Sequence, residues 1–139
     1  MTELIVIHGI SLPPGEYGGQ EIEALFTNTL DADAHPYFAE ISGLEVSAHF
    51  LVRRAGEVVQ FVSTDARAWH AGVSCWQGRE QCNDFSIGIE LEGCDDEAYS
   101  DAQYDALNQL LAALTKQYPD IRHDAIVGHS DIAPGRKTC

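Results

Sequence analysis

LIVIHG, at residues 4–9, is a short apolar run rich in Ile and Val that leads directly into a histidine. This composition and length predict a buried strand that ends at His8. FSIGIEL, at residues 85–91, predicts a second strand with alternating apolar positions, and residues 125–127 predict a short third one. His129 follows that third strand after one glycine. We therefore expect two histidines at strand ends, where a rigid sheet holds side chains at the open edge of a domain.

The segments between these strands predict a mixed α/β fold. The clearest helix signal is a capping box, Ser100 with Gln103, ahead of an apolar stripe that includes Tyr104, Leu107 and Leu114. The other expected elements are a loop at 11–19, a helix at 21–30, a loop through 31–36, a hairpin of strands at 46–52 and 57–62 and a long helix at 101–118. We predict a single domain over residues 1–139, with a central mixed β-sheet flanked by helices.

Charge and composition exclude several classes of protein. The chain has 22 acidic and 8 basic residues and a formal net charge of -14, which disfavours binding to nucleic acid or to anionic membranes. No apolar run approaches the roughly twenty residues of a membrane helix. The start of the chain, MTELIVIHG, lacks the features of a secretory signal, so we expect a cytoplasmic protein. In a reducing compartment Cys75, Cys82 and Cys94, whose spacing does not match a zinc knuckle, are expected to be free thiols.

The two histidines and the last residue raise the possibility of a metal centre. A catalytic zinc commonly has three protein ligands and one open position, and His, Cys and carboxylate are the usual donors. His8, His129 and Cys139 would supply two imidazoles and one thiolate. Their spacing alone is weak evidence, because a single histidine at a strand end is more often hydrogen-bonded scaffolding. From the residues alone, both readings stay open.

Five segments together resemble one known family: IVIHGISLPPGEYGG, AHPYFAEISGLEVSAHFLV, RAWHAGVS, CNDFSIGIELEG and GHSDIAPGRKT. They are similar to the zinc-dependent N-acetylmuramoyl-L-alanine amidases, specifically the cytoplasmic AmpD type that recycles fragments of the cell wall. The resemblance extends from residue 4 to residue 138. It implies an α/β fold that is shared with phage lysozyme-type amidases and with peptidoglycan recognition proteins.

The resemblance also implies roles for particular residues. His8 and His129 match the two histidine ligands of zinc. The third ligand of the AmpD type is an aspartate, and Cys139 stands at that position, as a cysteine does in the phage amidases. Glu90 matches the catalytic glutamate and is expected to act as general base and then general acid. Lys137 matches a lysine beside the metal, where a fixed cation stabilises an oxyanion.

Further positions bear on the substrate. Trp69 and His70, in RAWHAGVS, resemble the motif that lines the substrate groove, and core packing and scaffold bonding are the respective alternatives. Glu92 lies two residues after the proposed base, faces the same side of its strand, and is the second choice for that role. Glu45 and Gln81 stand where AmpD-type enzymes have arginines that meet the carboxylates of the peptide, which predicts weaker recognition of an acidic stem peptide.

The activity implied is zinc-dependent hydrolysis of the amide bond between N-acetylmuramic acid, in its 1,6-anhydro form, and L-alanine. The expected partners are anhydro-muropeptides, with no nucleic acid and no membrane. The alternative is a non-catalytic muropeptide-binding protein of the same fold, for which loss of a zinc ligand is the usual mark. A third hypothesis is a shortened chain with an incomplete site.

Three further residues are expected to have structural roles. Asn83 and Asp84 are expected to shape the loop before the strand, and His49 is expected to be structural.

Overall fold

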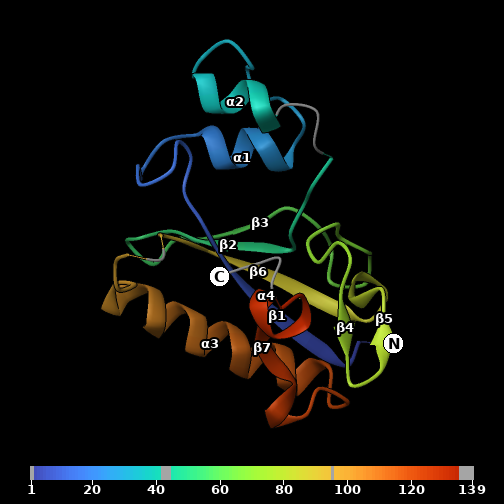
Figure 1. Cartoon of the computed structure of the whole chain (residues 1–139). Coiled ribbons are helices and arrows are strands. Elements are labelled where there is room, and N and C mark those ends of the chain that lie inside the picture. Colours follow the sequence, from blue (N-terminus) through green and yellow to red (C-terminus); the bar gives the residue numbers. More distant parts are fainter. Residues whose placement is uncertain (1, 42–44, 95, 135–139) are drawn as a thin grey trace.

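The computed structural model describes residues 2–41, 45–94 and 96–134 (Figure 1). Its centre is a five-stranded sheet with the strand order β3-β2-β6-β1-β7. The bounds are β1 (Leu4–Ile10), β2 (Phe50–Val52), β3 (Val58–Gln60), β6 (Ser86–Glu92) and β7 (Ile126–Gly128). Strand β1 runs parallel to both β6 and β7, β2 runs parallel to β6, and β3 is antiparallel to β2. The sheet is therefore mixed, as the sequence predicted.

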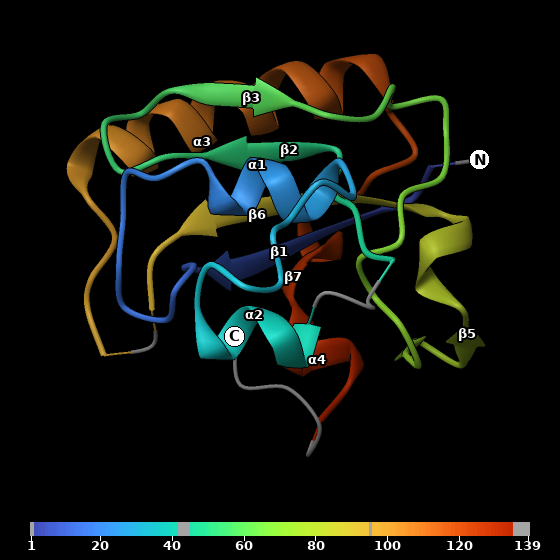
Figure 2. The same ribbon diagram turned by 90° about the horizontal axis from the view of Figure 1, so that it is seen from above.

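Helices cover both faces of this sheet. The bounds are α1 (Glu21–Phe26), α2 (Pro36–Ile41), α3 (Asp101–Gln117) and α4 (His129–Ile132), with short 3-10 turns at Cys82–Asp84 and His123–Ala125. A separate two-stranded ribbon pairs β4 (Cys75–Trp76) with β5 (Arg79–Glu80). Helix α3 lies against one face, and α1 and α2 lie beyond the other (Figure 1). Seen from above, α1 overlies the part of the sheet that contains β2 and β6 (Figure 2).

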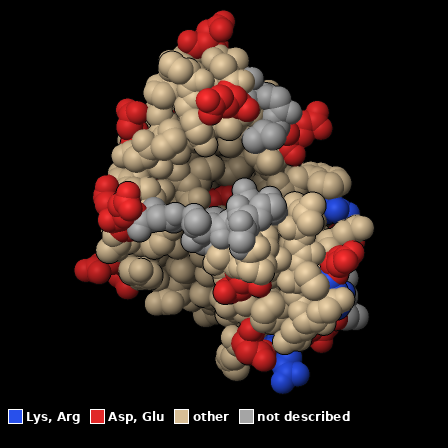
Figure 3. Space-filling view, viewed as in Figure 1, with Lys and Arg blue, Asp and Glu red and all other residues tan. Residues whose placement is uncertain are grey.

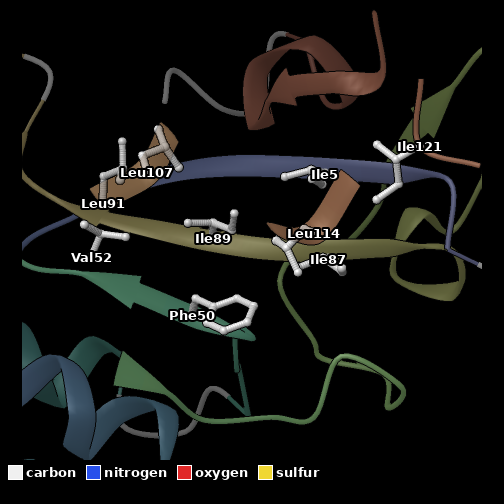
Figure 4. Close-up of a cluster of buried hydrophobic side chains, with 9 residues drawn as sticks. All are labelled: Ile5, Phe50, Val52, Ile87, Ile89, Leu91, Leu107, Leu114 and Ile121. Carbon is white, nitrogen blue, oxygen red and sulfur yellow. The ribbon is translucent and has the colours of Figure 1, made fainter. Parts of the chain in front are cut away.

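Alternation along β6 assigns its side chains to these two faces. Ile87, Ile89 and Leu91 belong to the apolar cluster that packs against α3 (Figure 4). Each fully buried side chain of this kind contributes roughly 1.5–3 kcal/mol relative to an exposed one. The intervening residues of β6 point to the opposite face because the side-chain period of a strand is two. They are Ser86, Gly88, Glu90 and Glu92, and all of them are buried.

The predicted capping box is confirmed and also fastens α3 to the sheet. The Gln103 amide N–H donates to the Ser100 hydroxyl at 3.1 Å, and the Ser100 N–H donates to Gln103 Oε1 at 3.0 Å. The side-chain amide of Gln103 then donates to the carbonyl oxygens of Val52, at 3.1 Å, and Glu92, at 2.9 Å. Two central strands thus meet the first turn of the helix at one buried residue.

Several expected bounds differ from the structure. The helix expected over 21–30 ends at Phe26, two residues before Asn28 takes a left-handed backbone with φ 60°. The loop expected through 31–36 gives way to α2. Tyr104, expected on the buried stripe, has an exposed side chain. Strand β1 continues two residues beyond His8, because Gly9 and Ile10 still pair with β6. Within the described residues, no helix combines the length and apolar character needed to cross a membrane.

Candidate metal centre and active site

His8 and His129 come together although 121 residues separate them in the chain. His8 lies in β1, and His129 directly follows β7, the strand that pairs with β1. Their Nδ1 atoms are 2.9 Å apart and their ring centroids 4.4 Å apart. Both residues are buried, with 3% and 5% of their surfaces exposed. The sheet therefore brings two imidazole nitrogens to one point.

The far nitrogen of each ring has its own partner. His129 Nε2 lies 2.8 Å from the carbonyl oxygen of Ala71. A carbonyl oxygen only accepts, so this nitrogen carries the hydrogen and the neutral ring keeps its lone pair on Nδ1. His8 Nε2 lies 3.0 Å from His70 Nδ1. Such partners are typical of metal-ligating histidines, whose second nitrogen is usually held by a carbonyl, a carboxylate or another polar group.

The pair fits two of the positions around a tetrahedral zinc. With Zn–N bonds of about 2.0–2.1 Å, the two nitrogens of a tetrahedral site are about 3.3 Å apart. The observed 2.9 Å needs an opening of only a few tenths of an ångström. Cys139, the expected third ligand, lies outside the described residues, as does Lys137. Within the described part of the chain, no group of three or more His, Cys, Asp or Glu side chains is arranged to hold an ion.

Glu90 lies next to His8 on the same face of the sheet. The two residues are register partners in the parallel pair of β1 and β6, and on the other side Glu90 pairs with Leu51 of β2. Neighbouring strands are about 4.8 Å apart, so the carboxylate and the imidazole project side by side. Glu90 is buried. Its position is that of a group able to exchange protons beside an ion held by His8.

His70 contacts His8 and faces away from solvent. Its Nδ1 meets His8 Nε2, and its Nε2 lies 3.0 Å from the hydroxyl oxygen of Ser86. Burial, together with smaller contributions from His49 and His129, lowers the pKa of His70 to about 3, so the ring is neutral at pH 7. Both of its nitrogens are engaged within the protein. These contacts agree with scaffold bonding, the alternative reading of His70, and the expected contact with substrate stays a prediction.

Trp69 is exposed, in contrast to its buried neighbour. Its backbone is fixed, because its N–H donates to the Ser47 hydroxyl at 2.9 Å and its carbonyl accepts the Ser47 N–H at 3.0 Å. The residue is 55% exposed, and the Arg67 guanidinium lies 4.2 Å from the ring centroid. Core packing, the alternative reading of Trp69, does not describe this position. The indole is held at the surface, one residue from the side chain that supports His8.

Glu92 has a structural position. It is 2% exposed, and its two carboxylate oxygens accept the backbone N–H groups of Gly18, at 2.9 Å, and Arg54, at 3.1 Å. Arg53 Nη1 lies 4.0 Å from the same carboxylate. Glu92 thus ties two loops to the end of β6, which separates it from the role considered for Glu90. The expected structural role of His49 also agrees with its contacts, to the Gly88 N–H at 3.0 Å and the Ala66 carbonyl at 2.8 Å.

The surface around the site is hollowed. In the space-filling view a depression lies below the region of α1 and α2, and an acidic side chain is visible on its floor (Figure 3). Basic side chains in this view gather toward the lower right edge, away from the depression. A pocket of about 600 Å³ lies beside α4, and its lining includes Val73, Gln81 and Ala133. Gln81, one of the two positions linked to peptide recognition, therefore lines a pocket that also borders α4.

Sequence reasoning missed the polar groups that contact His70 and His129. No sequence motif marks Ser86 or the carbonyl of Ala71 as a hydrogen-bond partner of a histidine, and neither was predicted. A signal for Ser86 exists in the alternation of β6, which places it on the same face as Glu90. No comparable signal exists for a backbone carbonyl in a loop, because its direction depends on the tertiary fold.

Comparison with known proteins agrees with this geometry. A family model described as N-acetylmuramoyl-L-alanine amidase matches residues 2–139. The 1,6-anhydro-N-acetylmuramyl-L-alanine amidase AmpD of Escherichia coli K12 is 64% identical over 135 residues, which cover 97% of this chain and 73% of that protein. The crystal structure of a selenomethionine AmpD derivative superimposes with a TM-score of 0.96 at 62% identity, covering 99% of this chain and 76% of that one.

A more distant structure shows the same fold with a ligand. Pseudomonas aeruginosa AmpDh3, in complex with anhydromuramic pentapeptide, superimposes with a TM-score of 0.74 at 31% identity. The match covers 98% of this chain and 53% of that one. The AmpD resemblance predicted from the five sequence segments is confirmed, and so is the mixed α/β fold. The chain belongs to the N-acetylmuramoyl-L-alanine amidase family.

Proposed function

We propose that this protein hydrolyses the amide bond between 1,6-anhydro-N-acetylmuramic acid and the L-alanine of a peptidoglycan fragment. The AmpD relative from Escherichia coli is named for that substrate, and the Pseudomonas aeruginosa relative binds an anhydromuramic pentapeptide. Anhydro-muropeptides are the partners that follow from this proposal. The cytoplasmic location and the extent of the domain over residues 1–139 stay predictions.

The observation that carries the proposal is the pair of buried imidazoles. His8 and His129 face each other through Nδ1 at 2.9 Å, and the Nε2 atom of each has a hydrogen-bond partner within the protein. We assign both as zinc ligands, with the Cys139 thiolate as the third, because nitrogen and thiolate donors favour zinc over hard cations. When bound, zinc lowers the pKa of its water to about 7 and polarises the carbonyl of the scissile amide.

Glu90 performs the proton transfers in this proposal. It takes a proton from the attacking water while the new C–O bond forms at the carbonyl carbon, and it then gives that proton to the nitrogen of L-alanine as the C–N bond breaks. The proton of the new carboxyl group passes to the released amine, so the products are the lactyl carboxylate and the ammonium group of the peptide. Lys137 would hold positive charge beside the oxyanion, and the exposed face of Trp69 would pack against the sugar or lactyl group.

The test compares two carboxylates of one strand. Glu90→Gln removes the proposed base, and we expect kcat to fall by about 10²–10⁴-fold with zinc still bound. Glu92→Gln is the matched control, since it changes the same group two residues away and leaves a side-chain oxygen to accept from the Gly18 or Arg54 backbone. Release of the peptide from an anhydro-muropeptide, followed by mass spectrometry, gives the rate for folded protein.

Each result has a distinct meaning. Full activity in Glu90→Gln contradicts the assigned role, and a loss confined to Glu92→Gln transfers that role to Glu92. Equilibrium binding of the muropeptide by the wild-type, zinc-loaded protein without any release of peptide would instead identify a non-catalytic binding protein.

A further inference from the structure

One buried side chain organises the segment that holds both metal-facing histidines. Asn83, in the 3-10 turn before β6, accepts two backbone hydrogen bonds with its Oδ1 atom. The donors are the N–H groups of His70, at 3.1 Å, and Ala71, at 2.9 Å. These are two consecutive peptide groups. A single amide oxygen therefore fixes the course of the chain at residues 70 and 71.

Each of these two residues contacts a different ligand. The side chain of His70 meets His8 Nε2 at 3.0 Å, and the carbonyl of Ala71 meets His129 Nε2 at 2.8 Å. A shift of this segment would disturb both contacts at once. The two hydrogen bonds of Asn83 Oδ1 go to the backbone and not to the ligand rings, so its effect on these rings passes through residues 70 and 71.

When the Nδ1 lone pairs of His8 and His129 both face an ion, the hydrogen of each ring is on Nε2, and this fixes the direction of the Nε2 hydrogen bonds. His129 Nε2–H donates to the Ala71 carbonyl, and His8 Nε2–H donates to His70 Nδ1. A His70 ring that accepts at Nδ1 carries its hydrogen on Nε2, which lies 3.0 Å from the Ser86 hydroxyl and donates to it. The Ser86 oxygen can accept, so the path from His8 ends on a satisfied group.

Gly88 provides the space that this arrangement requires. A Cβ atom at residue 88 would lie 2.5 Å from Cγ of the His70 ring, which is far inside a normal contact. The ring of His70 therefore packs directly over the backbone of β6. The position of this ring is set from three sides, by the Gly88 backbone, by Ser86 and by the peptide bonded to Asn83.

We propose that Asn83 is a positioning residue for both metal-facing histidines, acting through His70 on His8 and through the Ala71 carbonyl on His129. The inference rests on the proposed function where it takes zinc as the bound ion. Partners that orient metal-ligating histidines typically change metal affinity by 10–100-fold when they are removed. Because one side chain supports two ligands here, its removal acts on both.

The experiment measures zinc affinity by competition with a chromophoric chelator at pH 8. We expect Asn83→Ala to weaken zinc binding by about 10–100-fold. Asn83→Asp keeps an acceptor oxygen for both N–H groups, and we expect it to stay near the wild-type affinity. Ser86→Ala interrupts only the path to His8 and is expected to have a smaller effect than Asn83→Ala. Ser100→Ala, which removes the cap of α3, is a control for general loss of stability, with unchanged zinc affinity expected.

A second readout does not depend on zinc. The ring ¹⁵N shifts of the metal-free protein report which nitrogen of His129 carries the hydrogen, and we expect Nε2 in the wild type and a mixture in Asn83→Ala. Equal zinc affinity and an equal His129 signature in folded Asn83→Ala would overturn the proposal. If the wild type bound no zinc, the metal assignment would be wrong, and the ¹⁵N comparison alone would decide the role of Asn83.

Discussion

The two faces of β6 are both buried, yet they differ in chemistry. On one face Ile87, Ile89 and Leu91 pack against α3 in an apolar cluster (Figure 4). The other face carries three polar residues and one glycine, and Glu90 lies beside His8. Burying polar groups costs free energy unless each is hydrogen-bonded, so this second face must be organised in detail. Burial alone does not distinguish core from site, whereas the chemistry of the buried groups does.

The largest expected effect comes from removing a ligand on the polar face. His129→Ala deletes one Nδ1 donor, and we expect zinc affinity to fall by more than the roughly 100-fold upper value for an indirect partner. Cys139→Ala is the companion variant, and equal loss in both would identify the thiolate as a ligand. Elemental analysis of the purified proteins gives zinc per chain. Full zinc content in His129→Ala would remove the basis for the metal centre.

On the apolar face, truncation is expected to affect stability without affecting metal. Ile89→Ala should lower the free energy of unfolding by about 2–5 kcal/mol, and Ile89→Val by about 0.5–1.5 kcal/mol, because each leaves a cavity against α3. Urea unfolding measures both values. Zinc affinity of the folded variants is expected to match the wild type. A large drop in affinity for Ile89→Val would show that the two faces are coupled more tightly than their separate contacts suggest.

The contrast between the faces also marks the limit of sequence reasoning. The capping box at Ser100 and the strand containing Glu90 follow from local patterns, and the structure confirms both. Helix α2 was missed, because six residues beginning with a proline give little periodic signal. The pairing of His8 with Glu90 is a matter of strand register between distant segments, and only the family resemblance indicated it. The contacts of Asn83 depend on residues 12 and 13 positions away, which a local pattern does not encode.

The polar face should also make stability depend on pH. Burial lowers the pKa of His70 to about 3 and also lowers that of His49, below the ordinary value of 6.5. Below pH 6.5 the unfolded chain binds protons that the folded, metal-free protein does not, so stability falls as the pH decreases. For His70 the slope approaches about 1.4 kcal/mol per pH unit. Urea unfolding between pH 7.5 and pH 5 measures it.

The pH dependence of stability is expected to differ between the two faces of β6. The stability lost in Ile89→Ala is expected to be the same at each pH, since the buried members of its cluster are apolar and the tyrosines packed against it ordinarily titrate near pH 10. Constant wild-type stability down to pH 5 would mean that the buried histidines accept protons in the folded state. That result would contradict the neutral ring assigned to His70.

The smallest expected effect concerns the rim of the polar face. Gln81 is exposed, lines the pocket beside α4, and stands where AmpD-type enzymes are expected to have an arginine. Gln81→Arg adds a cation that can meet a peptide carboxylate, and exposed ion pairs contribute about 0.2–1 kcal/mol. We therefore expect KM for an acidic stem peptide to fall by about 1.4- to fivefold with kcat unchanged. Gln81→Met and a peptide with amidated carboxylates are the controls, and high salt should abolish the gain. An equal fall in KM with the amidated peptide would show that the arginine acts through contact area. Charge at this position would then not contribute to specificity.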